Sequence, residues 1–360
     1  MSDVQPVKRH EPSDPPTEPA ESRQRGLRDP NRRRDRYHML LLLAILIIEF
    51  VLLTALRPDA YPTARNLTSM AFQMSEIGLL ALAVACAMLI GGIDLSIVAV
   101  ANLSGIVAAK VMTALAPEMG GTALVVATGC ALGVGLVAGA VNGLLVSLLR
   151  VSPIVVTLGT MTLFTGVATG VTGGSTVFAA GEFASVGAIL VAGVPLVLLV
   201  LVLAAVALTV ATRSTRWGFR VYTVGASEKV SRYARLPVER VQVSAYLISG
   251  SLSALAGLVT LSRTDSISVG FGSSYLILAI LVAVLAGVSP YGGVGRLLAV
   301  PVAMAVMQQV STGLNMALAG AEGANFAKEF AWGAILILVL AVSEPRTRQW
   351  LRELVAVRRV

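Results

Sequence analysis

The feature that most constrains this chain is a succession of long apolar segments. A helix needs about 20 apolar residues to cross the ~30 Å hydrocarbon layer of a bilayer, and many stretches reach that length. Only 13% of the 360 residues are charged, whereas a soluble domain carries about 25%. We therefore predict an all-α, polytopic integral membrane protein. About ten transmembrane helices are expected, at residues 37–56, 67–90, 94–114, 122–149, 153–172, 186–211, 241–261, 274–289, 296–317 and 326–342.

Basic residues gather outside these segments, in two tails and one long internal loop. The predicted divisions are a tail at 1–36, a transmembrane domain at 37–343 containing a loop at 212–240, and a second tail at 344–360. Lys and Arg are enriched in the cytoplasmic loops of membrane proteins, so we predict that both tails and this loop are cytoplasmic. The same distribution explains the net charge of +8 without a basic groove, and we expect no nucleic-acid partner.

The first 36 residues are rich in Pro, Glu, Asp, Ser and Arg and have almost no large apolar side chains. Such a segment cannot bury enough surface to fold, and we predict a disordered basic tail. A signal peptide would have a short apolar core followed by a small-residue cleavage site. Here the apolar run follows a long tail and continues to Leu56, so we predict an uncleaved first span.

The residues Gly91-Gly92-Ile93-Asp94-Leu95-Ser96 interrupt an apolar region that extends from about 77 to 107. A carboxylate at membrane depth costs roughly 2.5–3.5 kcal/mol on insertion scales. Unpaired backbone groups are tolerated there only where protein or a water-filled cavity covers them. We predict a helix broken near Gly91 and Gly92. We expect Asp94 to cap the helix that restarts after the break, since its carboxylate can accept hydrogen bonds from the unpaired N–H groups there. The second-ranked alternative is that Asp94 lines a pathway.

Further polar side chains within the spans are candidates for a pathway or for joining helices. For Glu49 and Glu76 we favour hydrogen-bonded acids that hold helices together over acids that carry protons. If these acids and Asp94 coupled transport to an ion, the chain would be a secondary transporter, and this alternative stays open. The candidates for the helix break and a pathway are Gly91, Gly92, Asp94, Ser96, Asn102 and Glu76.

Small residues recur at a spacing of four in the fourth predicted span. Gly129 and Gly133 form one pair, and Gly135, Gly139 and Gly143 form a second series. This spacing lets helix backbones approach closely in lipid, so we expect these glycines to serve packing.

The loop at 212–240 is the one sizeable polar element predicted between spans. Ser227 suits the N-cap of a short helix, Glu228 its positive first turn, and Pro237 the position after its end. Val230 and Tyr233 are three residues apart and give this basic helix an apolar face. From these residues alone, a helix lying in lipid headgroups and a docking surface for a cytoplasmic protein are equally favoured.

Motifs for catalysis and metal binding are missing from the sequence. None of the four lysines follows a glycine, so a Gly-Lys-Ser/Thr phosphate-binding loop is excluded. His10 and His38 are the only histidines, which excludes a His/Cys zinc cluster and a Ser-His-Asp triad inside the membrane. We predict no catalytic residues, no metal site and no cofactor. The chain is not expected to be an enzyme, and any ATP-driven role requires another subunit.

Together, several motifs resemble those of the ribose/arabinose/galactose-type (carbohydrate uptake) ABC importer permeases. Segment 91–96 is similar to the signature of that family. One departure is Arg220, which lies one place later than the family's Gly-Arg pair before Tyr222. Pro237 and the pairs Gly292-Gly293 and Gln308-Gln309 are closer to the autoinducer-2 importer branch. The other matching pieces, in the family's order, are Val141-Asn142-Gly143-Leu144-Leu145-Val146, 151–160, 217–225, Gly292-Gly293-Val294-Gly295-Arg296 and Gly313-Leu314-Asn315.

This resemblance implies a membrane permease subunit of an importer for a monosaccharide or a similar small polar solute, with autoinducer-2 as the alternative. A permease for branched-chain amino acids is a related alternative, which the complete 91–96 string disfavours. The implied partners are a cytoplasmic ABC ATPase, a second permease chain (a copy or a sister chain), an extracytoplasmic solute-binding protein and the lipid bilayer. The implied location is the bacterial inner membrane.

The resemblance also implies that segment 227–236 docks into the ATPase. Val230 and Tyr233 would be the buried contacts, and Arg232 and Arg235 would lie at the rim. The candidate residues of this coupling loop are Gly225, Ser227, Glu228, Val230, Arg232, Tyr233, Arg235 and Leu236.

Overall fold

The computed structural model describes residues 30–149, 151–179, 182–319 and 324–343. Most of the predicted N-terminal tail and the whole predicted tail at 344–360 lie outside these residues. The chain divides into two compact units at Leu41, and the described part of the first unit is the beginning of helix α2 (Pro30–Leu56). This helix begins at Pro30, inside the segment predicted to be disordered, because proline is well suited to the first turn of a helix.

Nine of the ten predicted spans each overlap one described helix, the span at 186–211 overlaps the end of α7 and most of α8, and the all-α fold is confirmed. Among the residues that the structure describes, seven helices, α2 to α6, α8 and α11, have the length and apolar composition needed to cross a membrane, so the number ten stays a prediction. The other overlapping helices are α12, α13 and α14. After α2, the helices of the described residues are α3 (Ala64–Leu89), α4 (Ile97–Met119), α5 (Thr122–Leu149), α6 (Pro153–Thr172), α7 (Glu182–Gly187), α8 (Leu196–Ser214), α9 (Arg216–Ala226), α10 (Glu228–Tyr233), α11 (Val238–Thr264), α12 (Tyr275–Leu285), α13 (Ala299–Ala317) and α14 (Ala324–Ser343).

The predicted span at 186–211 was wrong at its start. Strands β2 (Leu190–Val191) and β3 (Val194–Pro195) form a hairpin there, and α8 begins only at Leu196. Ala192 and Gly193 both have positive φ angles, as a two-residue hairpin turn requires. A second antiparallel pair joins β1 (Val177–Phe178) to β4 (Ser266–Ile267).

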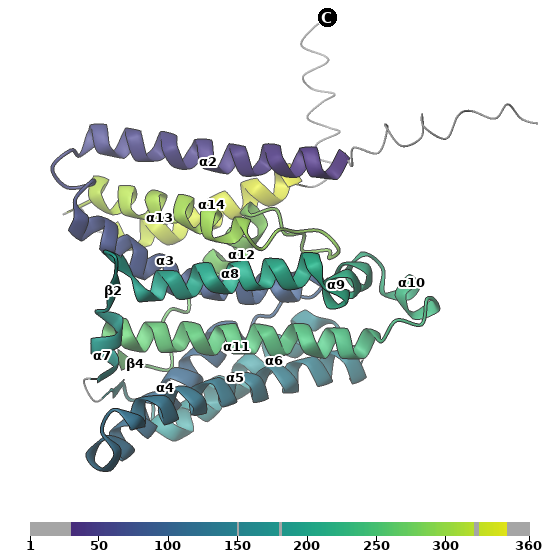
Figure 1. Ribbon diagram of the computed structural model, residues 1–360, viewed down its shortest axis with the longest axis horizontal. Coiled ribbons are helices and arrows are strands. Elements are labelled where there is room, and N and C mark those ends of the chain that lie inside the picture. The colour runs from purple at the N-terminus through teal and green to yellow at the C-terminus, as the bar shows by residue number, and fades with distance from the viewer. Residues whose placement is uncertain (1–29, 150, 180–181, 320–323, 344–360) are drawn as a thin grey trace, which may run out of the picture. The chain divides into compact units, whose positions relative to one another are not determined.

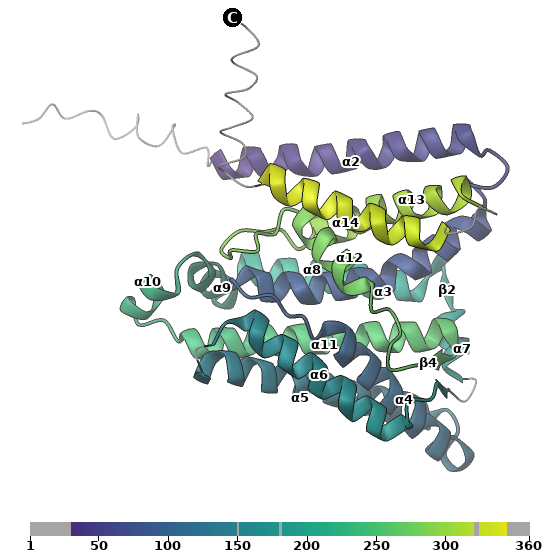
Figure 2. The ribbon, with the colours of Figure 1, turned by 180° about the vertical axis from the view of Figure 1, so that it is seen from behind.

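The second unit is built around α3 and α11. Helix α11 packs against α3, α4 and α5, and α3 is buried from Ser75 to Leu89. Helices α9 and α10 lie together at one end of the long helices, which we call the α10 end, whereas the strands lie at the opposite end (Figure 1). Helix α4 packs against α5, α6 and α11, and the view from behind shows α6 beside α5 (Figure 2).

Glycines allow α5 and α11 to touch through their backbones. A Cβ atom on Gly139 would lie 2.3 Å from the Tyr246 carbonyl oxygen, and one on Gly250 would lie 2.1 Å from the Gly135 carbonyl oxygen. The predicted close packing is therefore correct for Gly135, Gly139 and Gly143. Gly129 and Gly133 have nothing within 4 Å of such an atom among the described residues of this single chain, so close packing at these two positions stays a prediction.

Candidate functional site

Gly91 and Gly92 form the connection between α3 and α4. Helix α3 ends at Leu89 and α4 begins at Ile97, so the predicted interruption is present. Gly91 has a φ of 80°. Its N–H donates to the Met88 carbonyl at 2.9 Å, and the Gly92 N–H donates to the Ala87 carbonyl at 3.0 Å. This pair of bonds is a Schellman motif, in which the left-handed position favours glycine.

Asp94 lies at the centre of a buried polar cluster. One carboxylate oxygen accepts hydrogen bonds from the Ser96 N–H (3.0 Å) and hydroxyl (2.7 Å), and the other accepts one from the Ser249 hydroxyl (2.8 Å). Asn142 donates to the Ser96 hydroxyl at 2.8 Å. The cluster therefore joins the start of α4 to α5 and α11.

Asp94 does not occupy the N-cap position of α4, as its predicted capping role would require, because it lies two residues before that position. Ser96 is the N-cap residue of α4, but its own side chain makes no capping bond. Asp94 instead satisfies the N–H of Ser96, and only 2% of Asp94 is exposed. A group so enclosed by its partners does not line an open pathway in this conformation.

Thr157, near the start of α6, also forms hydrogen bonds to the connection between α3 and α4. Its hydroxyl accepts a hydrogen bond from the Leu95 N–H at 3.1 Å and lies 3.0 Å from the Ile93 carbonyl oxygen. The Tyr246 hydroxyl also lies next to this connection, because a Cβ atom added to Gly92 would be 2.6 Å from the Tyr246 hydroxyl oxygen. That hydroxyl is buried without a hydrogen-bond partner among the described residues.

Glu76 and Asn102 were grouped with the break by the sequence, but they contact other elements. Glu76 accepts a hydrogen bond from Arg263 of α11 at 3.0 Å, in a partly buried ion pair. Asn102 donates to the carbonyl oxygens of Val269 and Phe271, both at 2.9 Å. Both side chains join separate elements of the chain. For Glu76 this agrees with the interpretation favoured from the sequence, an acid that holds helices together.

Glycines from three distant segments meet at the α10 end, and we call Gly91, Gly225, Gly292 and Gly293 the glycine junction. A Cβ on Gly225 would lie 1.9 Å from the Leu89 carbonyl oxygen and 2.6 Å from the Gly293 nitrogen. A Cβ on Gly292 would lie 2.8 Å from the Gly91 nitrogen. The Gly293 N–H donates to the Leu89 carbonyl at 3.0 Å. The end of α9 thus rests on the end of α3 with no side chain between them.

The short helix predicted in the internal loop is present as α10. The Ser227 side chain accepts a hydrogen bond from the Val230 N–H at 3.3 Å, as expected of an N-cap. Arg235, with a φ of 56°, follows the end of the helix, and the Leu236 N–H returns to the Ser231 carbonyl. Tyr233 is 80% exposed and Val230 is 61% exposed, so the apolar face has no cover from the described residues.

Arg232 makes one ion pair within α10, to Glu228, and one to Glu239 at the start of α11. Its guanidinium lies 2.8 Å from Glu228 and 2.5 Å from Glu239. Hydrogen bonds to Glu239 and then Glu228 hold the pKa of Arg232 above its usual range. Arg232 was predicted to lie at the rim of a contact with a partner, and in the structure it also braces the helix internally.

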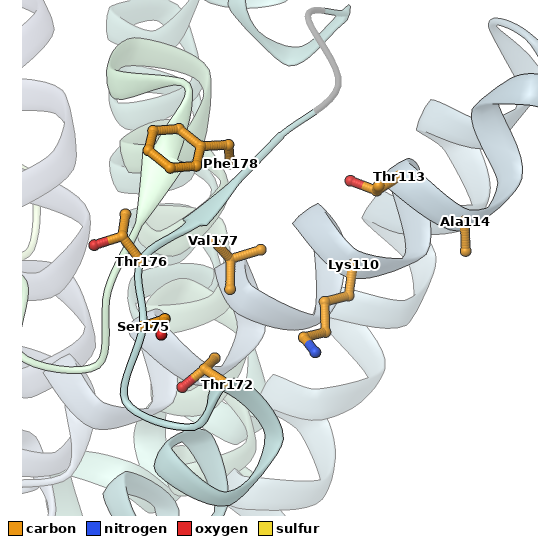
Figure 3. Close-up of a pocket in the computed structure, with 8 residues that line it drawn as sticks. All are labelled: Lys110, Thr113, Ala114, Thr172, Ser175, Thr176, Val177 and Phe178. Atoms are coloured by element: carbon orange, nitrogen blue, oxygen red, sulfur yellow. The ribbon is translucent and has the colours of Figure 1, made fainter.

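An open pocket of about 500 Å³ lies near the end opposite α10. Figure 3 shows Lys110 and Thr113 of α4 on one side of this pocket and the turn after α6 on the other. Thr172, Ser175 and Thr176 add hydroxyl groups to its wall. Among the described residues, no group of three or more His, Cys, Asp or Glu side chains could hold a metal ion.

Replacing Asp94 separates hydrogen bonding from charge. In Asp94→Asn, the amide oxygen can keep both bonds to Ser96 and the amide nitrogen can donate to Ser249, so we expect a loss below about 1 kcal/mol. Asp94→Ala leaves buried donors without an acceptor, at about 1–3 kcal/mol for each group. Thermal unfolding of the purified protein in detergent measures both. An Asn variant as unstable as the Ala variant would show that the charge itself is required.

Comparison with known proteins gives consistent matches over most of the chain. The profile of a family described as "Branched-chain amino acid transport system / permease component" matches residues 66–340. Over 288 residues, the chain is 30% identical to the D-allose transport system permease protein AlsC of Escherichia coli (strain K12), covering 78% of this chain and 84% of that protein. It is 33% identical over 275 residues to the ribose import permease protein RbsC of Bacillus subtilis (strain 168), covering 75% and 83%.

Two further comparisons extend over more of the chain. The autoinducer 2 import system permease protein LsrD of Escherichia coli (strain K12) is 29% identical over 330 residues, covering 87% of this chain and 95% of that protein. A solved structure of a metal-chelate type ABC transporter in an inward-facing conformation aligns with a TM-score of 0.50 at 14% identity. It covers 84% of this chain and 98% of the other. At this identity the structural match shows a shared fold.

Proposed function

Because this chain belongs to the branched-chain amino acid transport system / permease component family, we propose that it is the membrane-spanning subunit of an ATP-driven ABC importer. A solute-binding protein delivers the solute at the end opposite α10. Two permease chains enclose the pathway, and two ATPase subunits dock at the α10 end. In this arrangement the α10 end faces the cytoplasm and the protein lies in the bacterial inner membrane.

The observation that carries this proposal is the exposed apolar face of α10. Tyr233 and Val230 are exposed on a helix of only six residues, which cannot be stable by itself. The ion pairs of Arg232 and the cap of Ser227 hold this helix in place. An exposed aromatic residue on a rigid support is typical of an energetically important interface contact. The glycine junction supports the proposal, because it places the base of this segment directly on the end of α3.

We propose a monosaccharide as the solute, since relatives named for D-allose and ribose match most of the chain. Autoinducer-2 is the second candidate. It is favoured by the relative named for autoinducer 2, which aligns over 95% of its own length.

Uptake into proteoliposomes tests the proposed mechanism. We expect uptake of D-ribose, D-allose or autoinducer-2 only when this chain is reconstituted with its ABC ATPase, ATP and a binding protein. An ATPase that binds but does not hydrolyse ATP should abolish uptake, because the permease has no energy source of its own. Uptake by this chain alone, driven by a proton or sodium gradient, would instead establish a secondary transporter.

The docking surface can be tested in the same preparations. The double variant Val230→Ser and Tyr233→Ser should reduce co-purification of the ATPase about 30-fold, equal to the loss of about 2 kcal/mol from one central contact. The matched control is Leu190→Ser with Val191→Ser, because these side chains are also exposed but lie in the hairpin at the opposite end. Unchanged co-purification would place α10 in the lipid headgroups instead.

A further inference from the structure

A second hollow, of about 270 Å³, lies on α3 toward the end opposite α10. We propose that it is a binding site in the permease for a neutral, polyhydroxylated solute that enters from that end. This inference rests on the proposed function and deepens it, because it assigns the solute a place within this chain. The hollow is lined by Arg65, Thr68, Ser69, Phe72, Gln73 and Arg263.

The first argument is the spacing of the lining residues on α3. Residues 65, 68, 69, 72 and 73 follow one another at three- and four-residue steps, so they share one face of the helix. This face holds an arginine, two hydroxyls and an amide in a chain whose helices are otherwise largely apolar. Ionisable side chains within membrane spans almost always face the bundle interior or a water-filled cavity. This face of α3 is therefore expected to meet water.

The second argument is the ion pair at the inner side of the hollow. Arg263 lies 3.0 Å from Glu76, and only 3% of the Glu76 side chain is exposed. Glu76 is twelve residues beyond the start of α3, or about 18 Å along the helix at 1.5 Å per residue. An ion pair this deep marks a polar route into the membrane. Because Glu76 balances the charge of Arg263, the inner side of the hollow suits a neutral ligand better than an anion.

The third argument is the mixture of donors and acceptors. The Gln73 amide donates to the Ser69 hydroxyl at 3.1 Å, and its oxygen accepts a bond from Gln308 at 3.3 Å. Hydroxyl and amide groups both donate and accept hydrogen bonds, as the hydroxyls of a sugar do, whereas an anion requires donors alone. Phe72 adds an apolar surface for the C–H face of such a solute. Small-molecule sites commonly combine an apolar wall with a few placed polar groups.

Cysteine labelling tests the site without ATP hydrolysis. In a background carrying Cys86→Ala and Cys130→Ala, Ser69→Cys places a thiol in the hollow. The matched control is Leu67→Cys, which is on the same helix and 39% exposed but does not line the hollow. A membrane-impermeant maleimide added to the reconstituted importer should label Ser69→Cys faster than Leu67→Cys. D-ribose, D-allose, D-glucose and glycerol, each at high concentration, are the probes for protection.

At least one sugar of this panel should slow labelling of Ser69→Cys. Adding Arg263→Lys should weaken that protection about tenfold, as expected for the loss of one hydrogen bond to a charged group, with protection measured against the sugar-free labelling rate of the same variant. Equal labelling of the two cysteines, or protection by inorganic phosphate or phosphatidylglycerol but by none of the sugars, would overturn the inference. Because labelling uses no ATP, it can fail while ATP-dependent uptake is intact, so the two proposals are separable.

Discussion

Replacing Gly225 by alanine is expected to uncouple ATP hydrolysis from uptake while the chain still inserts into the membrane. The new Cβ would lie 1.9 Å from the Leu89 carbonyl oxygen and 2.6 Å from the Gly293 nitrogen. Both are backbone atoms, so the end of α9 must move away from α3. Forced backbone shifts of this kind cost typically 1–3 kcal/mol, which corresponds to roughly a 5-fold to 150-fold drop in uptake if the cost falls on the coupled state.

The measurement is the number of ATP molecules hydrolysed for each solute molecule taken up by proteoliposomes. This ratio should rise sharply in Gly225→Ala, because α10 can still bind the ATPase but its movement no longer reaches α3. Gly129→Ala is the matched control, since it adds the same methyl group where nothing lies within 4 Å. A normal ratio in Gly225→Ala would show that the glycine junction does not transmit movement.

Features that depend on neighbouring residues could be predicted from the sequence. The short helix α10 was expected because Ser227, Glu228 and Pro237 lie within one stretch of ten or so residues, and its cap and end are as predicted. The interruption at Gly91 and Gly92 was expected because only a local pattern is needed to end a helix. The resemblance to sugar-importer permeases, based on short motifs, is confirmed by the relatives named for D-allose and ribose.

Contacts between distant residues could not be predicted in this way. Arg263 and Glu76 are 187 positions apart, and the sequence showed two charges without indicating that they pair. Ser249 and Asn142 were missed as partners of the Asp94 segment, because single hydroxyl and amide residues are common in membrane helices. The junction of Gly225 with Gly293 was missed because the two glycines lie in separate motifs, and no local pattern indicates that these motifs touch.

Replacing Gly139 by valine is expected to prevent stable folding. A Cβ at this position would lie 2.3 Å from the Tyr246 carbonyl oxygen and 2.9 Å from the Leu247 Cα. Helix α11 would have to move away from α5, and the buried bonds of Asn142 to Ser96 and of Ser249 to Asp94 link these same helices. We expect a loss of about 3 kcal/mol or more, at the upper end of the range for overpacking. The measurement is the fraction of protein that stays monodisperse in detergent after heating.

Gly133→Val makes the same change on the same helix, where nothing lies within 4 Å, so it controls for the lower helix propensity of valine. Equal heat resistance of the two variants would mean that the α5–α11 contact yields easily and does not fix the polar cluster around Asp94.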